Sequence, residues 1–438
     1  MSQRLLIKGG RLVDPATGRD GLGDVLVEGD RIARVGTDAS LGAGPDDRII
    51  HAAGLVVTPG LIDMHTHLRE PGKAEEETIL SGSRAAVAGG VTTVACFPNT
   101  EPAIDNEAAA EFVILQGKRA HYANVLPVGA ITMNREGQRL AEMGGLARAG
   151  AVAFSDADHA VESAEMMRRG MAYARMFDRV LIAHCEDRSL RGGGVMNQGL
   201  VSLRLGLAGI PNAAEEIMVA RDITLARVTG ARLHIGQMST AGSVDLLRQA
   251  KAKGARVTGE ATPHHFTLTE ACVEGFDPHF KMIPPLRTAE DVQAIVEGLL
   301  DGTIDVIATG HAPHSPEEKE VEFSNAPFGV IGIETLFPVA YSDLVLRHRM
   351  PFIQLIEKMT VNPARILGIA GERGSLEPGR FADISVFDLE KLRTIDTERF
   401  QSKSRNCPFQ GREVRGTPVH VLVGGRPVLL DGAIQQPG

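Results

Sequence analysis

The sequence predicts an α/β protein, a (β/α)8 barrel of the TIM type with a small β subdomain formed from both chain ends. From about residue 59 to 365, apolar runs such as VTTVACFPN, RVLIAHCED and IDVIATGH alternate with stretches rich in Ala, Leu, Glu and Arg. Strands that alternate with helices form parallel sheets, and about eight such units favour closure into a barrel. The 438 residues suit one barrel with a modest accessory domain.

The two chain ends have a different pattern from the middle. Residues 1–58 contain short alternating runs such as DVLVEGDRIARVG, and residues 366–438 repeat that pattern in VHVLVGGRPVLLDG. Alternation with a period of two, broken by Gly, Asp and Pro, is typical of hairpins. We therefore expect 1–58 and 366–438 to pair in one sheet that brackets a barrel over 59–365.

Composition is that of an ordinary globular protein, with 43% hydrophobic and 23% charged residues and a formal charge of −9. No basic run is interleaved with aromatic residues, which argues against nucleic acid as a partner. No stretch approaches a membrane span or an apolar leader, and the four cysteines show no CxxC spacing. We expect a cytoplasmic homo-oligomer that acts on a small molecule.

The strongest local signal is GLIDMHTHLREPG at residues 60–72. His65, His67 and Arg69 are spaced two apart, so on a strand their side chains point the same way. Two imidazoles on one face can share a divalent metal ion. The alternative is a pair of surface or capped histidines.

Further potential ligands follow later strands, at the end where a barrel places its active site. AFSD supplies Asp156 and AHCED supplies His184. Histidine and carboxylate around zinc, with a position left for water, predict metal-assisted hydrolysis. Taken singly, His184 is equally well a core histidine and Asp156 a helix cap. Taken together, they are better explained by a site.

Longer motifs point to one family. They are DMHTHLREPG, AGGVTTVACFPNT, AVAFSD, AHCED, GEATPHHFTLTE, HAPHSPEEKE, APFGVIGIET and VNPARILG. In these motifs, nearly the whole chain resembles the class I dihydroorotases of the amidohydrolase superfamily. That family interconverts N-carbamoyl-L-aspartate and dihydroorotate in pyrimidine biosynthesis. Hydantoinases and allantoinases are the alternative, but their bridging ligand is usually a carboxylated lysine, whereas AVAFSD offers Asp156.

The resemblance implies zinc as cofactor. It implies that His65 and His67 hold one zinc, and that Asp156 bridges to, or shares, a second metal with His184. The substrate-binding residues that it implies are Arg69 and Asn99 for the carboxylate, with His314, Phe328 and Gly329 around the ring and carboxylate. A guanidinium fork suits a carboxylate on physical grounds as well. Asn99, in FPNT, is otherwise a turn residue.

Three positions depart from the family pattern. Gln237 stands where the resemblance implies a metal-binding histidine, Ile283 replaces an asparagine, and Gly310 replaces the aspartate that acts as ligand and general base. His234, on the opposite side of its strand, does not replace that histidine. Loss of a general base typically costs about 10² to 10⁴ in rate.

Two hypotheses follow. The first is a zinc-dependent dihydroorotase or related cyclic-amide hydrolase whose activity is lowered, with Asp158, His311 or His314 as candidates to replace the missing acid. The second is a non-catalytic homologue that acts as a structural partner, for instance of aspartate carbamoyltransferase. The first hypothesis is favoured by the retained residues His65, His67, Asp156, His184 and Arg69, and the second by Gln237, Ile283 and Gly310.

Overall fold

The computed structural model describes residues 4–42, 44 and 47–436. Within these residues, the middle of the chain forms a parallel sheet in the order β15-β14-β13-β10-β9-β8-β7-β6. A parallel bridge between Thr66 and His311 joins the first strand to the segment after the last, and so closes the barrel. The strands are β6 (Leu61–Thr66), β7 (Val91–Cys96), β8 (Asn124–Gly129), β9 (Ala153–Phe154), β10 (Val180–Ala183), β13 (Leu233–Ile235), β14 (Val257–Ala261) and β15 (Val306–Ile307).

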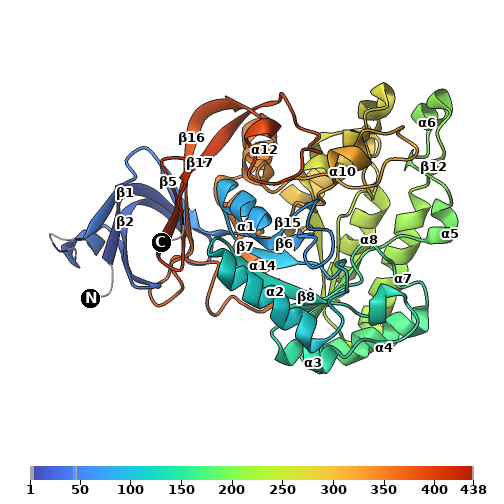
Figure 1. Cartoon of the computed structure of the whole chain (residues 1–438), viewed down its shortest axis with the longest axis horizontal. Coiled ribbons are helices and arrows are strands. Elements are labelled where there is room, and N and C mark those ends of the chain that lie inside the picture. Colours follow the sequence, from blue (N-terminus) through green and yellow to red (C-terminus); the bar gives the residue numbers. More distant parts are fainter. Residues whose placement is uncertain (1–3, 43, 45–46, 437–438) are drawn as a thin grey trace.

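Helices surround the barrel on its outside, as Figure 1 shows. They are α1 (Ile79–Ala88), α2 (Glu107–Ala120), α3 (Met143–Arg148), α4 (Ala164–Arg175), α7 (Ala213–Thr229), α8 (Ala241–Ala252), α10 (Ala289–Leu300), α12 (Leu336–Ala340), α13 (Phe352–Met359) and α14 (Val361–Leu367). Several begin at a side-chain cap, such as Thr240 before α8, as expected where a loop turns into a helix. No helix in the described ranges is long and apolar enough to span a membrane.

The two chain ends form one sheet, in the order β19-β18-β17-β16-β5-β1-β2-β3, with β4 paired to β1. Its strands are β1 (Arg4–Asp14), β2 (Arg19–Glu28), β3 (Arg31–Gly36), β4 (Arg48–His51), β5 (Val56–Pro59), β16 (Ile384–Thr394), β17 (Glu413–Val423), β18 (Arg426–Leu430) and β19 (Ala433–Ile434). The two ends meet where β5 pairs with β16, with Val57 opposite Val386. Blue and red strands therefore lie side by side in Figure 1. The predicted barrel and two-ended β subdomain are confirmed.

Apolar packing holds both parts in place. Ile62, Val128 and Ile182 belong to one buried cluster with Leu367 of α14. Alternate residues of the terminal strands, including Val57 and Val386, form a separate core. Burial of each side chain of this size stabilises the folded state by about 1.5–3 kcal/mol. The packed core therefore holds the strand ends in place.

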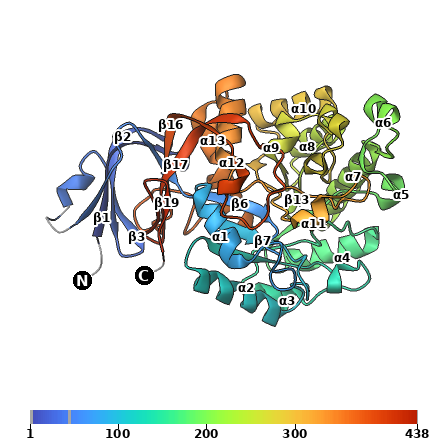
Figure 2. The same ribbon diagram turned by 45° about the horizontal axis from the view of Figure 1, so that its top comes forward.

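Shorter elements follow the strands and surround the barrel mouth (Figure 2). They are η2 (Met133–Arg135), α5 (Arg188–Arg191), β11 (Met196–Asn197), α6 (Leu200–Leu205), β12 (Gly209–Ile210), α9 (Pro263–Thr267), η3 (Glu270–Gly275), η4 (Pro278–Phe280) and α11 (Pro316–Lys319). The remaining short helices are η1 (Ala39–Gly42), η5 (Tyr341–Arg347) and η6 (Thr397–Arg399). In barrels, the loops at the carboxyl ends of the strands carry the site.

Candidate active site

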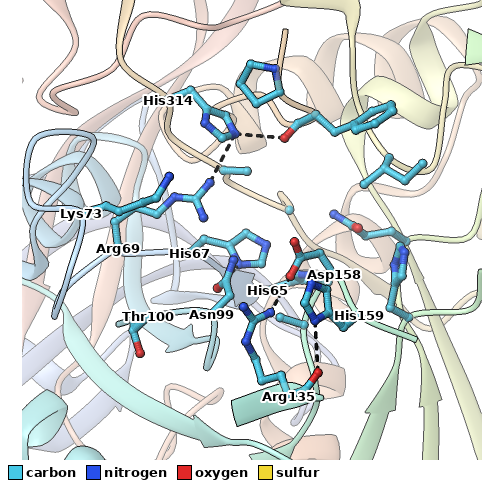
Figure 3. A pocket seen from close by; sticks show the side chains of 18 of the residues that line it. His65, His67, Arg69, Lys73, Asn99, Thr100, Arg135, Asp158, His159 and His314 are labelled. Carbon is cyan, nitrogen blue, oxygen red and sulfur yellow. Dashed lines mark hydrogen bonds and ion pairs between the residues drawn. The ribbon is translucent and has the colours of Figure 1, made fainter. Parts of the chain in front are cut away.

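A cavity of about 470 Å³ opens among the carboxyl ends of the barrel strands (Figure 3). Most of the residues singled out in the sequence line it: His65, His67, Arg69, Asn99, His184, Gln237, Ile283, Gly310, His314 and Phe328. Asp156 and Gly329 are not among the described lining residues. Asp158, named from the sequence as a candidate to replace the missing acid, also lines the cavity, and the lining residues that the sequence argument did not place there include Lys73, Arg135, His159, Arg188 and Arg191.

The two histidines of β6 and its extension are each held by one ring nitrogen. His65 Nδ1 lies 2.5 Å from a carboxylate oxygen of Glu260, and its ring stacks on Phe97 with centroids 4.0 Å apart. His67 Nδ1 lies 2.7 Å from Oδ1 of Asn99. Metal-binding histidines are usually oriented in this way by a partner on the second nitrogen. Asn99 therefore has a clear positioning contact in addition to its expected role towards substrate.

Glu260 is the buried charge beneath this histidine pair. Its second oxygen lies 3.2 Å from Nε2 of His234, whose Nδ1 lies 2.8 Å from the hydroxyl of Thr258. Burial raises the pKa of Glu260, but the imidazoles of His65 and His234 outweigh that effect and lower the pKa to about 2. The carboxylate therefore stays ionised and orients both rings. His234 lies fully buried in the barrel.

Asp156 lies outside the position expected for a metal ligand. Its carboxylate accepts hydrogen bonds from the backbone N–H groups of Ile131 and Thr132, at 2.8 and 3.0 Å, and from the Thr132 hydroxyl at 2.5 Å. These contacts occupy both oxygens in the interior. The chain then turns at Ala157, which has φ 56°, and the half-exposed carboxylate of Asp158 enters the cavity instead. The carboxylate of Asp156 therefore lies in the interior, and Asp158 lines the cavity.

Gly310 and Gln237 occupy the same corner of the cavity. Gly310 has φ +60°, and a Cβ built on it falls on the amide nitrogen of Gln237. The backbone before Gly310 is fixed because Thr309 donates to the buried carboxylate of Asp63 through its N–H, at 3.1 Å, and its hydroxyl. The amide of Gln237 therefore fills the space in which an acid at position 310 would begin.

The histidines after Gly310 are not free bases. His311 points away from the cavity, with Nε2 3.5 Å from Glu77, and its Nδ1 accepts the N–H of Gly332. His314 donates from Nε2 to the Phe328 carbonyl at 3.0 Å, and its Nδ1 lies 3.1 Å from Glu318. Burial, Arg69 and Lys319 lower the pKa of His314 to about 4. This ring is thus neutral near pH 7, and its single N–H donates to one of these two acceptors.

The donors at the mouth do not fit the expected zinc centre. In the part of the chain that the structure describes, three ligand atoms lie within 4.8 Å of one another only at Glu76, His314 and Glu318. Arg69 and Lys73 already neutralise that group, with Arg69 Nε 2.8 Å and Lys73 Nζ 2.7 Å from Glu76. At the mouth itself the imidazoles of His65 and His67 are oriented, but Gly310 and Gln237 stand where the family pattern implies an acid and a further histidine ligand.

Positive charge dominates the cavity lining. Arg69, Lys73, Arg135, Arg188 and Arg191 line it, against the carboxylates of Glu101 and Asp158. Arg69 is 8% exposed, has φ 60°, and donates from Nε to the Pro313 carbonyl at 3.1 Å. Guanidinium groups pair with carboxylates through directional, charge-assisted hydrogen bonds. The cavity therefore favours an anionic ligand.

Solved structures with the same fold include hydantoinases. The L-hydantoinase (dihydropyrimidinase) of Arthrobacter aurescens matches with a TM-score of 0.88 at 26% identity, covering 100% of this chain and 98% of that one. A D-hydantoinase (dihydropyrimidinase) of Thermus sp. gives 0.84 at 25% identity, with coverages of 99% and 97%. Residues 337–429 match the model of the amidohydrolase family. Fold and site together define the amidohydrolase class.

Sequence relatives narrow this class. Residues 54–243 match the dihydro-orotase-like family model. The dihydroorotase of Pelotomaculum thermopropionicum is 52% identical over 432 residues, covering 99% of this chain and all of that protein. The dihydroorotase of Acetivibrio thermocellus is 48% identical over 427 residues, with coverages of 98% and 99%. The chain therefore belongs to the dihydroorotase family, and the comparisons support a cyclic-amide hydrolase.

Proposed function

We propose that the cavity binds N-carbamoyl-L-aspartate and dihydroorotate and interconverts them with strongly reduced turnover, as a dihydroorotase-type protein of pyrimidine biosynthesis. The main support for this proposal is the lining of the cavity. Cationic side chains lie around Arg69, and the amide of Gln237 occupies the space next to Gly310. Both ligands carry carboxylates, which suit guanidinium donors. The side of the cavity that would activate water has lost its acid.

Reduced turnover follows from the state of the remaining acid–base groups. Hydrolysis adds water to the ring amide carbonyl, breaks the C–N bond and delivers a proton to the leaving nitrogen. An efficient base has a pKa near the working pH. Burial raises the pKa of Asp158, but Arg135, His159 and neighbouring imidazoles outweigh it and hold that pKa well below the ordinary range. The pKa of His314, about 4, also lies below that optimum.

Zinc is inferred for this site from the family alone. A metal supplies polarisation of the carbonyl and activation of water in such hydrolases. Here three imidazoles, those of His65, His67 and His184, remain at the mouth, and His184 Nε2 is buried 3.8 Å from Glu186, with no hydrogen-bond partner among the described residues. Without a free carboxylate beside them, we propose that zinc-supported turnover is weak.

Two measurements on the purified chain test the proposal. Calorimetric titration is expected to give saturable binding of both dihydroorotate and N-carbamoyl-L-aspartate. Hydrolysis of dihydroorotate with added zinc is expected to stay at least about 10²-fold slower than in an intact dihydroorotase, the lower end of the cost of a lost base. Absence of binding to either ligand, or turnover equal to that of an intact enzyme, contradicts it.

The second candidate is a non-catalytic homologue that forms a complex with aspartate carbamoyltransferase. Gly310 and Gln237 favour it, because together they remove the acid and fill its place. Co-elution of the two purified proteins in gel filtration, with no turnover in either direction, supports this function. Light scattering of the chain alone tests the expected homo-oligomer, and a hydantoin hydrolysis assay tests the hydantoinase-like alternative.

A further inference from the structure

Arg135 stands where the cavity would need a cation. It ends the η2 turn after β8, has φ 61°, and donates from Nη1 to Oδ1 of Asp158 at 2.8 Å. Figure 3 shows this side chain reaching Asp158 beside the rings of His67 and His159. Its side chain is 16% exposed, so the guanidinium lies mostly out of water. A fixed positive charge therefore sits next to the imidazole pair of β6.

The same ion pair occupies Asp158, one of the two carboxylates that line the cavity. Asp158 lines the same cavity as His67 and His184. A metal ion and the guanidinium of Arg135 compete for this carboxylate. Arginine remains protonated in proteins, so the competition does not end at any physiological pH.

Arg135 also keeps a donor for a ligand. Its Nε is buried and has no hydrogen-bond partner among the described residues. Water does not reach this atom, so a ligand would accept from the part of the guanidinium that lines the cavity. Carboxylate and amide oxygens both accept from a guanidinium.

We infer that the guanidinium of Arg135, held by Asp158, supplies the positive charge that a metal ion would otherwise supply, so that the cavity binds an anionic cyclic amide or its open ureido acid without a divalent ion. This inference deepens the proposed function and rests on it for the ligand. It needs no metal and no bond-making step.

The experiment compares metal uptake and ligand binding in three proteins. They are the wild type, Arg135→Gln, and the control Arg168→Gln, whose guanidinium pairs with Glu165 on the exposed face of α4. Each is treated with chelator, desalted, and titrated with dihydroorotate. Each is then incubated with zinc, desalted again and analysed for metal. Circular dichroism establishes that each variant is folded, and Arg135→Met, which also removes the charge, replaces Arg135→Gln if the latter is not.

Wild type and the Arg168→Gln control are expected to bind dihydroorotate in chelator and to retain no stoichiometric zinc. Arg135→Gln is expected to bind dihydroorotate roughly tenfold or more weakly, the scale of one lost charge-assisted hydrogen bond. It is also expected to take up zinc, because Asp158 is released towards His67 and His184. A merely structural role for Arg135 does not produce that gain of metal.

Failure of the inference differs from failure of the proposed function. If wild type retains one zinc per chain, or binds dihydroorotate only with zinc, Arg135 does not replace the metal, although the proposed function stands. If no protein binds either ligand but only Arg135→Gln takes up zinc, the proposed ligand is wrong and the charge replacement stands. Equal zinc content and equal affinity in wild type and Arg135→Gln overturn the inference.

Discussion

The two halves of the barrel mouth differ in how many of the residues implied by the family resemblance they retain. One half, around Arg69, Asn99 and Phe328, keeps the residue types that the family resemblance implies for holding an anionic substrate, and all three line the cavity. The other half, where the resemblance implies metal ligands and a base, has Gly310 and Gln237 instead. This difference shows that substrate binding and catalysis in one barrel depend on residues at different strand ends. One can therefore be lost without the other.

The backbone of the altered half still has the shape of a site. Gln237 and Gly310 both have positive φ, 49° and 60°, as do Arg69 and Ala157 at other strand ends. Non-glycine residues in this region are uncommon and gather at functional sites. Since His and Asp are among the residues that tolerate this conformation best, the backbone would accept the ligands that the sequence lacks.

The largest expected effect is a gain of turnover when the altered half is restored. In Gln237→His/Gly310→Asp the flexible amide that occupies the corner is replaced by an imidazole ligand and the new carboxylate supplies a base, so dihydroorotate hydrolysis with zinc is expected to rise about 10²- to 10⁴-fold. Gly310→Asp alone is the matched control and is expected to gain much less, because Gln237 blocks its carboxylate. A folded double variant with wild-type turnover would show that the missing acid is not what limits this half.

A smaller effect is expected in the half that binds the anion. Arg69→Lys keeps the charge but loses the fork and its contacts with Glu76 and Pro313. Dihydroorotate affinity is expected to fall about 10- to 100-fold, because hydrogen bonds to charged groups contribute about 1.5–3 kcal/mol. Arg168→Lys on α4 serves as the surface control. Unchanged calorimetric affinity in Arg69→Lys would remove this residue from the binding half.

Backbone strain at Gly310 is expected to appear as a loss of stability. Gly310→Ala places a Cβ at φ +60° against the movable end of Gln237, so the expected cost is about 1–2 kcal/mol, set mainly by the left-handed conformation. Gly193→Ala, where a Cβ meets nothing within 4 Å, is the control. Denaturant unfolding measures both. Equal stability of the two variants would mean that position 310 carries no conformational demand.

The smallest effect concerns pH and lies in the binding half. Arg69, Glu76, Glu318 and Lys319 surround His314, whose pKa is lowered from 6.5 to about 4. As the pH falls, His314 is protonated first in the unfolded chain, because its pKa is higher there than in the folded chain. The extra free energy of unfolding of wild type relative to His314→Gln is therefore fully present above pH 6.5. It is expected to decline as the pH falls from 6.5 towards 4. Unfolding curves that differ by a constant amount across this range would contradict the neutral ring.

The fold could be predicted almost entirely from the sequence. Apolar runs of period two and helix-like segments are local signals in the sequence. VHVLVGGRPVLLDG has the same alternating pattern of apolar and polar residues as the amino-terminal strands. The positions of His65, His67 and Arg69 at a strand end followed from the same pattern. These residues line the cavity because the strand sets their direction.

The details of the site depended on turns that no local pattern reveals. Asp156 and Asp158 are two apart, which on a continued strand puts them on one face. The left-handed turn at Ala157 breaks that rule, so Asp156 faces the interior and Asp158 the cavity. Arg135 was missed for a similar reason, since it approaches from the loop after a different strand and only the folded barrel brings it to Asp158.

The most direct test of the account is titration of the wild-type chain with dihydroorotate, before and after removal of all divalent metal by chelation. The account predicts one saturable site per chain with the same affinity in both conditions, because Arg69 and Arg135 supply the positive charge themselves. A loss of affinity of tenfold or more on chelation, reversed by added zinc, would contradict it.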